Sequence, residues 1–419
     1  MAFEVDFSRF SGLRWRHSLA WHTAAQRMLA FGLSQRSRAQ PGHAPASRRR
    51  TFLGGGRAVA AGKKRIGVIG VGFGLMVHVP GFRSEGWDVV ALSSRSRERA
   101  QRAAQDAGIA DIHTDPHELI RRNDIDAVAI ATPPGPHHEL SLAALKAGKH
   151  VLCEKPFAVN AKQAAEMRAA AEKSGKTAMV AHEFRHTPQR AYIKQLLDHG
   201  YIGQANLCTL ELFVDRSSPP KAGPAPWSSK TSEGGGFLGA LGSHYIDGLR
   251  FWFGDLERVS GKVTRLRPDL VDPKSGKPVK SETDDTFSFT AVFRSGVIAS
   301  MTASFATSPT RGARIAVMGS EGTLYAEQPG ANPMEDGVVL GSRLGAPLQK
   351  LDTPPQFTPF KDDRDNRLMA FRLLVRDFTR GIDTGSSPAP NFTDGWRCQQ
   401  VLDAVRESSE TGRSVKITG

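Results

Sequence analysis

Cysteine is scarce in this chain, and the few cysteines present form no recognisable pattern. The 419 residues include three, Cys153, Cys208 and Cys398. Their wide separation fits neither a CxxC metal pattern nor a dense disulfide framework. We therefore interpret them as small buried hydrophobic residues, and we predict no metal site and a reducing compartment, the cytoplasm.

Long apolar runs are also missing. No stretch supplies the roughly 18 to 20 consecutive apolar residues that a membrane-spanning helix requires, and hydrophobic residues make up an ordinary 39% of the chain. We therefore predict no membrane partner. The length is sufficient for two domains with substantial cores, so size does not exclude an enzyme.

Acidic residues are nearly absent from the first 62 positions. This segment holds ten arginines, no lysine and two acids, Glu4 and Asp6, so it carries +8 of the formal +14 charge. It lacks an apolar period, and we predict a basic, disordered tail at 1–62. Its charges are scattered, which favours a solvated or processed segment over a nucleic-acid partner.

The tail leaves other origins open. The sequence RRTFL at 49–53 resembles a twin-arginine export signal, but a short glycine-rich stretch broken by Arg57 follows it in place of an apolar region. Export, an organellar presequence, and a start codon assigned too far upstream therefore remain alternatives to a cytoplasmic protein.

From Lys63 onward the pattern indicates a parallel sheet. Short apolar segments typical of strands occur at 65–70, 88–94, 127–132 and 150–154. A helix is predicted at 138–147, between the last two. Strands that alternate with helices are joined as βαβ units. The prediction is an α/β, doubly wound Rossmann domain at 63–183.

After about residue 205 the pattern becomes antiparallel. Strand-like segments occur at 205–214, 259–266, 286–293, 297–305, 314–318 and 323–326. We predict an α+β domain at 184–419 with one large open sheet. Helices at 364–381 and 394–412 should pack back on the body, and 267–281 should be a polar loop. The free sheet face suits a second copy of the chain, as a homodimer or homotetramer.

A glycine turn connects the first predicted strand to the next helix. Gly70 permits the tight turn, and Gly72 lets a pyrophosphate approach the backbone amides at the helix N-terminus. Phe73 and Gly74 complete the proposed cofactor segment. Leu75 replaces the third glycine of GxGxxG, so an ordinary glycine turn stays open as an alternative.

The end of the second strand bears on the choice of cofactor. Ser94 and Arg95 lie near the position where an acid would hold the ribose 2′-hydroxyl of NAD. A guanidinium group and hydroxyls suit a 2′-phosphate instead, so NADP is favoured over NAD. The alternative is that Arg95 is a solvated cation at the start of a helix.

The most specific segments are ATPPGPH at 131–137 and AGKHVLCEKP at 147–156. In them the chain resembles the Gfo/Idh/MocA oxidoreductases, with Glu-Lys-Pro at a strand end as the family's hallmark. The resemblance extends over roughly 63–419. It implies a nicotinamide-dependent transfer of hydride from a secondary alcohol of a sugar, cyclitol or related polyol.

Lys155 is the leading catalytic candidate. It follows a strand at the edge where an open α/β sheet binds its ligand, and its ammonium can stabilise the alkoxide that precedes hydride loss. It also counts among the cofactor contacts, with Glu154 orienting Lys155 or the cofactor. Thr132 and Pro133 are expected at the nicotinamide ribose. His137 is either a cofactor contact or a histidine at a helix start.

The second family signature is GGG at 234–236, followed by GSHYID at 242–247. A helix from about Gly239 would put Ala240, His244 and Asp247 on one face. We predict that His244 binds substrate and accepts its hydroxyl proton. Asp247 is a substrate ligand, a carboxylate that compensates for Ala240, or a helix anchor. Many family members carry aspartate at the position of Ala240, so a mechanism that needs that aspartate cannot be transferred.

Two further residues are candidates for substrate binding. Arg185 lies in EFRHTP at 183–188, where the family crosses between its domains, and it either holds substrate or joins the domains. Trp227 either stacks on a sugar face or anchors its loop.

Two other functions stay open at this point. One is a glycosidase-like lyase with tightly bound NAD. The other is a non-catalytic dinucleotide-binding regulatory protein. This alternative is considered because Ala240 replaces the acid that many family members carry.

Overall fold

The computed structural model describes residues 63–215, 226–267, 269–271, 275–329 and 337–418. The predicted tail at 1–62 and its RRTFL segment lie outside these residues. Among the described helices, none combines the length and the apolar character needed to cross a membrane.

Six parallel strands form the first sheet, in the order β3-β2-β1-β4-β5-β6. Its elements are β1 (Arg65–Ile69), η1 (Gly74–His78), α1 (Val79–Ser84), β2 (Asp88–Ser93), α2 (Arg97–Ala107), β3 (Asp111–His113), α3 (Pro116–Ile120), β4 (Ala127–Ile130), α4 (His137–Lys146), β5 (His150–Cys153), α5 (Ala161–Ser174) and β6 (Ala178–Val180). The predicted Rossmann fold is confirmed. The order reverses at β1, and ligands of such sheets bind at the carboxyl ends of the strands beside that reversal.

Helices cover both faces of this sheet, and one of them comes from far along the chain. Helices α1 and α2 lie on one face, and α3, α4 and α5 on the other. Helix α8 (Leu368–Thr384) joins α1, where Phe371 and Phe378 pack against Phe82. As expected, this late segment packs back on the body, and it completes the core of the Rossmann sheet.

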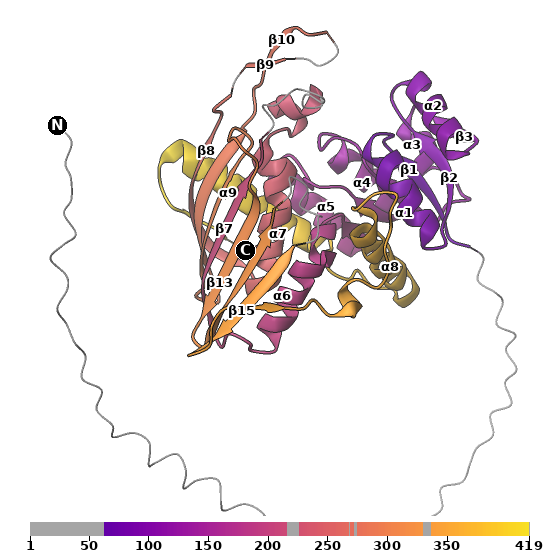
Figure 1. The fold of residues 1–419 in the computed structure, drawn as a ribbon. Coiled ribbons are helices and arrows are strands. Elements are labelled where there is room, and N and C mark those ends of the chain that lie inside the picture. Colours follow the sequence, from indigo (N-terminus) through magenta and orange to yellow (C-terminus); the bar gives the residue numbers. More distant parts are fainter. Residues whose placement is uncertain (1–62, 216–225, 268, 272–274, 330–336, 419) are drawn as a thin grey trace, which may run out of the picture. The chain divides into compact units, whose positions relative to one another are not determined.

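Nine strands form the second sheet, in the order β16-β15-β14-β13-β7-β12-β11-β8-β17. Among the described strands of this sheet only β7 and β12 pair in parallel, so the expected large, mostly antiparallel sheet is confirmed (Figure 1). The remaining elements are η2 (Glu183–His186), α6 (Pro188–Asp198), β7 (Ala205–Phe213), η3 (Pro226–Ser229), η4 (Thr231–Glu233), η5 (Leu238–Gly242), α7 (Ser243–Phe253), β8 (Leu256–Thr264), β9 (Asp269–Val271), β10 (Pro278–Lys280), β11 (Thr286–Phe293), β12 (Ile298–Ser304), β13 (Gly312–Gly319), β14 (Gly322–Gln328), β15 (Val338–Arg343), β16 (Gln349–Leu351), η6 (Pro355–Phe357), α9 (Phe392–Thr411) and β17 (Val415–Lys416).

The predicted polar loop at 267–281 was wrong in part. Strands β9 and β10 pair antiparallel within it as a separate two-stranded sheet. Each has only three residues, which is too short for alternation to be recognised in the sequence.

One face of the nine-stranded sheet is buried under α6, α7 and α9. Along β7 the side chains of Cys208, Leu210 and Leu212 point into this core, whereas Leu207 and Glu211 are exposed on the opposite face. This alternation is the period of a sheet with one covered face.

Candidate active site

The turn after β1 requires glycine at its first position. Gly70 has a φ of +108°, and a Cβ there would lie 2.3 Å from the carbonyl oxygen of Ala131, at the end of the neighbouring strand β4. At Gly72, by contrast, no atom lies within 4 Å of the Cβ position. The backbone at Gly72 is therefore open to a ligand's close approach, which is what a pyrophosphate needs.

The missing third glycine is replaced by a neighbouring one. A Cβ at Gly74 would lie 2.9 Å from Cγ1 of Val68, so Gly74 provides the close contact of helix and strand expected of the third glycine. Leu75 is only half-buried in the same turn. This turn, η1, is π-helical, and π-turns are frequent at functional sites.

The π-turn also positions a histidine that the sequence reasoning missed. His78 is fully buried, and its Nε2 lies 2.8 Å from Oε1 of Glu154. Burial alone would raise the pKa of Glu154, but the hydrogen bond with His78 and the charge of Lys155 outweigh it and lower that pKa. Glu154 also accepts a hydrogen bond from the backbone N–H of Lys155. It is thus an ionised, fully engaged carboxylate at the end of β5.

The predicted selectivity residues lie at the end of β2. Ser94 is half-buried and Arg95 is exposed. The first turn of α2 is capped by Ser96, whose hydroxyl accepts a hydrogen bond from the N–H of Arg99. Arg95 therefore stands just outside the helix, with its side chain in solvent at the carboxyl edge of the sheet.

His137 joins two strand ends. Its ring is fully buried, with Nε2 2.9 Å from the carbonyl oxygen of Thr132 and Nδ1 3.0 Å from that of Pro156. Burial lowers its pKa, so the ring is neutral and donates to one carbonyl at a time. Both nitrogens face the protein, which favours the structural alternative. Thr132 keeps a buried hydroxyl with no partner among the described residues, beside the half-buried Pro133.

Lys155, at the carboxyl edge of the Rossmann sheet, contacts the domain that contains the nine-stranded sheet. Its side chain is half-buried, and its Nζ donates a hydrogen bond to the carbonyl oxygen of Ala240 at 3.1 Å. Ala240 lies in η5, a second π-turn that runs directly into α7. The predicted helix start near Gly239 is thus close to the observed one, and the residue that lacks a carboxylate still contacts the lysine through its backbone.

His244 lies in the first turn of α7 and is almost completely buried. Its ring stacks on Phe184 with the centroids 3.7 Å apart and the planes at 5°. Burial, followed by the charges of Lys155 and Arg190 and the neighbouring His182, lowers its pKa well below the usual value. The imidazole is therefore neutral near pH 7 and able to accept a proton.

The sequence reasoning also missed a carboxyl group beside this histidine. Glu183 begins η2, three residues after β6 ends, and is 2% exposed. Its Oε1 lies 3.9 Å from Nε2 of His244, and its Oε2 has no hydrogen-bond partner within the described part of the chain. Burial and the charge of Glu154 raise its pKa to about 8. The signal for it was its place after β6, a three-residue strand that was not predicted.

Arg185 and Asp247 are engaged with each other. The Nε and Nη2 of Arg185 each donate to a carboxylate oxygen of Asp247 at 2.7 Å, and Nη2 also reaches Asp394 of α9 at 3.1 Å. Both members of the pair are buried. The pair ties η2, α7 and α9 together, which corresponds to the domain-joining and helix-anchoring alternatives.

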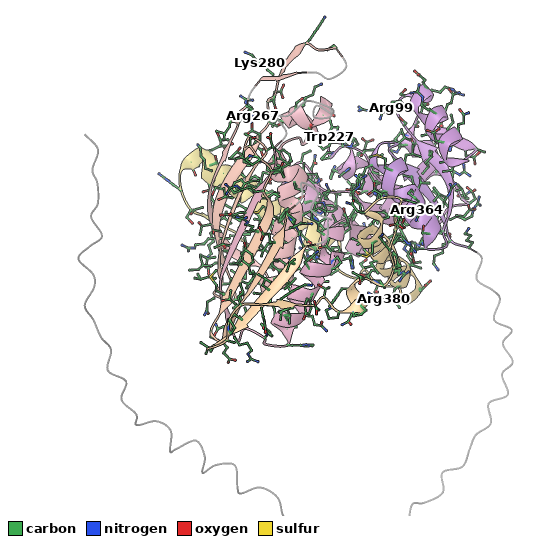
Figure 2. The ribbon with its side chains drawn as sticks, viewed as in Figure 1. Arg99, Trp227, Arg267, Lys280, Arg364 and Arg380 are labelled. Carbon is green, nitrogen blue, oxygen red and sulfur yellow. The ribbon has the colours of Figure 1, made fainter. Side chains whose placement is uncertain are left out.

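Trp227 lies on the short helix η3 and is half-buried (Figure 2). Its carbonyl oxygen accepts a hydrogen bond from Lys230, and the next carbonyl, that of Ser228, accepts one from Gly236. The loop is thereby fixed to the GGG segment. That segment packs on the Rossmann domain, because Gly234 lies against Pro134.

Comparison with known proteins identifies the family. Residues 64–182 match the oxidoreductase family with an NAD-binding Rossmann fold, and residues 191–325 match the Gfo/Idh/MocA C-terminal domain. A 1,5-anhydro-D-fructose reductase from Ensifer adhaerens is 31% identical over 337 residues, which cover 80% of this chain and 92% of that protein. The chain belongs to the Gfo/Idh/MocA oxidoreductases.

Other relatives of this Gfo/Idh/MocA protein cover most of its length. Myo-inositol 2-dehydrogenase from Thermotoga maritima is 27% identical over 366 residues, 84% of this chain and 98% of that protein. The crystal structure of an oxidoreductase domain protein from Kribbella flavida has a TM-score of 0.77 at 29% identity and covers 85% of this chain and all of the other.

These findings confirm the predicted family and enzyme class: the protein is an NAD-binding oxidoreductase. The two alternatives, a lyase with tightly bound NAD and a non-catalytic regulator, gain no support. The roles of individual site residues in this Gfo/Idh/MocA enzyme stay predictions, and so does the preference for NADP.

Proposed function

We propose that this enzyme reversibly oxidises a secondary alcohol on a cyclic polyol or sugar. The observation that carries the proposal is the meeting of Lys155, from the end of β5, with the backbone of Ala240, four residues before His244. An ammonium and a neutral imidazole from two domains thereby converge. The named activities of the relatives, on an anhydrosugar and on inositol, support a ring-shaped substrate.

The chain's residues fit a dinucleotide at the carboxyl edge of the Rossmann sheet. Gly70, Gly72, Phe73 and Gly74 would border the pyrophosphate, and Ser94 with Arg95 the adenosine ribose. The hydroxyl of Thr132, which has no partner in the described part of the chain, would face the nicotinamide ribose next to Pro133. When bound, the nicotinamide supplies the hydride acceptor.

The protein's own part in the reaction concerns the hydroxyl proton. Lys155 would donate a hydrogen bond to the substrate oxygen and stabilise negative charge there. Neutral His244 would take the proton as the O–H bond breaks, and the electron pair of the C–H bond would leave as hydride. Glu154, held by His78, would orient Lys155. Arg185 and Asp247 would hold η2 and α7 in position, and Trp227 would border the sugar.

Near-ultraviolet absorbance of reduced nicotinamide tests this proposal. The purified chain is incubated with NAD or NADP and a panel of cyclitols, anhydrosugars and open sugars. We expect reduction with at least one cyclic polyol. We expect Lys155→Ala to lower kcat by about 100- to 1000-fold, the usual cost of losing one group that stabilises developing negative charge. Lys162→Ala, at an exposed lysine on α5, is the matched control. No reduction by any polyol would contradict the proposal.

The choice of cofactor has its own variant. If Arg95 holds a 2′-phosphate, Arg95→Glu should weaken NADP binding by about 10- to 100-fold, the worth of a charged hydrogen bond, and leave NAD binding nearly unchanged. Arg97→Glu, at an exposed position at the start of α2, controls for net charge. Equal losses for both cofactors would argue against the NADP preference.

The expected homodimer or homotetramer would use the exposed face of the nine-stranded sheet. Leu207 and Ile298 are cross-strand neighbours there and are each nearly half exposed. Light scattering of the wild type and of Leu207→Lys tests this face, since a buried lysine would shift the mass toward the monomer. The expected cytoplasmic location is tested by sequencing the N-terminus of protein isolated from its host.

A further inference from the structure

The carboxyl group of Glu183 is buried beside His244, the proposed proton acceptor, and the proposed reaction gives it no role. Glu183 is 2% exposed, and buried acids are normally paired or hydrogen-bonded. Its Oε2 has no partner among the described residues, and Oε1 is 3.9 Å from Nε2 of His244. That separation is slightly too long for a hydrogen bond, but catalytic contacts often tighten only when substrate binds.

The surroundings of Glu183 are charged on several sides. The segment η2 packs on α6, α7 and α8, and the groups that face the carboxyl are Glu154 and Lys155 after β5, Arg190 on α6, His244 on α7 and Arg367 at the start of α8. Glu154 disfavours ionisation of Glu183, whereas Lys155 and Arg367 favour it. The carboxyl therefore lies within the electrostatic reach of both residues proposed for the chemistry.

The imidazole is oriented to carry a proton toward this carboxyl. Its ring is stacked on the ring of Phe184. The guanidinium carbon of Arg190 lies 4.7 Å from the ring centre of Phe184 and 4.2 Å from that of Tyr245. Nε2 of His244 faces Glu183, while Nδ1 has no partner in the described chain. Nε2 is thus the nitrogen on the side of Glu183, and Nδ1 is buried with its hydrogen-bonding capacity unused among the described residues.

One turn before His244, position 240 carries no acid. Ala240 has no carboxylate, and it offers Lys155 only a backbone carbonyl. An imidazole that accepts a proton in a buried site is stabilised by a nearby carboxyl group. In this chain the nearest such group comes from η2 and not from η5.

We propose that Glu183 is the proton-relay partner of His244. The inference rests on the proposed alcohol oxidation. During oxidation the substrate O–H bond breaks and an N–H bond forms at Nδ1 of His244. The N–H bond at Nε2 then breaks and an O–H bond forms on Glu183, while the hydride leaves separately for the cofactor. Carbonyl reduction runs the same transfers backward.

The direction of proton transfer then depends on pH. With a pKa raised to about 8 by burial and by Glu154, Glu183 is protonated at neutral pH and can supply a proton for carbonyl reduction. Alcohol oxidation needs the ionised form. The rate of oxidation should therefore rise as pH increases through about 8, and the rate of reduction should fall over the same interval.

The first test compares pH profiles of kcat in both directions for the wild type, Glu183→Gln and Glu410→Gln, an exposed acid on α9. Glu183→Gln should abolish the pH dependence of kcat near pH 8. It should also lower kcat by about 100-fold, which is within the range for acid–base groups, and change KM little. Glu183→Asp, or Ala240→Asp placed in the Glu183→Gln background, should restore part of the rate. A Glu183→Gln enzyme that keeps the pH dependence overturns the relay.

The second test uses the cofactor-free protein and needs no turnover. Infrared spectra should contain a buried carboxylic-acid carbonyl band that disappears as pH rises through about 8 and is missing from Glu183→Gln. Its absence from the wild type overturns the proposal. If no polyol is oxidised, the proposed function fails while this band still decides whether Glu183 stores a proton. If Glu183→Gln does not fold, Glu183→Asp replaces it in the pH profiles of kcat. The aspartate variant should shift the midpoints of the oxidation and reduction profiles. The relay is wrong if neither midpoint moves.

Discussion

Among single residues, Glu183 links the reaction to the stability of the fold. Burial raises its pKa from 4.5 to about 8, so between these values the folded protein holds a proton that the unfolded chain has released. The folded state therefore binds more protons in this interval. The contribution of Glu183 to stability therefore falls as pH rises from about 4.5 to about 8 and then levels off.

Glu183→Gln removes this titration, because an amide does not ionise. The melting temperature of the variant minus that of the wild type should grow from pH 5 to pH 9. Over this range, the difference between the unfolding free energies of the variant and the wild type should change by at most about 5 kcal/mol. Each pH unit between the unfolded and folded pKa values contributes about 1.4 kcal/mol. Differential scanning fluorimetry measures it, with Glu410→Gln as control. A difference that stays constant with pH would show that Glu183 is ionised throughout.

At the level of elements, the two π-turns η1 and η5 have related positions. Each precedes a helix, and each brings one contact to the end of β5: His78 of η1 reaches Glu154, and Ala240 of η5 accepts from Lys155. The Glu154-Lys155 pair is thus fixed from both domains. Such support from rigid elements is what a catalytic lysine requires.

The glycine turn provides a matched pair of substitutions. Gly70→Ala places a Cβ 2.3 Å from a carbonyl oxygen at positive φ, so it should cost about 2–4 kcal/mol of stability. Gly72→Ala meets no neighbouring atom and should leave the melting temperature nearly unchanged while weakening cofactor binding at least tenfold. Thermal unfolding and calorimetric titration measure the two effects. If Gly72→Ala bound the cofactor as tightly as the wild type, the pyrophosphate would not bind at this turn.

Much of this site could be predicted from the sequence because its motifs mark strand ends. Lys155 and Gly70 follow apolar strands long enough to be recognised, and both lie where predicted. Glu183 and His78 could not be found in the same way. Strand β6, before Glu183, has only three residues, and His78 reaches its partner through a π-turn, which shifts the helical phase. The pairing of Arg185 with Asp247 depends on tertiary contacts that periodicity does not report.

For the whole molecule, the union of the two sheets depends on buried ion pairs and on α8. Arg185 joins η2 to α7 and α9 through Asp247 and Asp394, while α8 carries aromatic side chains back to the Rossmann core. The crossing between domains is therefore fixed on both sides of the site. This arrangement explains how a lysine of one domain can stay aligned with a histidine of the other.

Removing one member of the buried pair should be costly. Arg185→Met leaves Asp247 uncompensated and should destabilise the protein by about 3–5 kcal/mol. The double variant Arg185→Met with Asp247→Leu removes both charges and should recover much of that loss. Urea unfolding of the two single variants and the double variant gives the coupling energy. Additive losses would show that the two side chains are not paired in solution.

The central claim is that the Lys155 and His244 site moves a hydride between a ring carbon and nicotinamide. A cyclic polyol carrying deuterium on its carbinol carbons tests it most directly, with mass spectrometry of the reduced cofactor as the readout. We expect a cofactor heavier by one deuterium with the wild type, and formation of the labelled cofactor that is about 100- to 1000-fold slower with Lys155→Ala. Reduced cofactor without deuterium, or equal rates of labelling by both proteins, would contradict the claim.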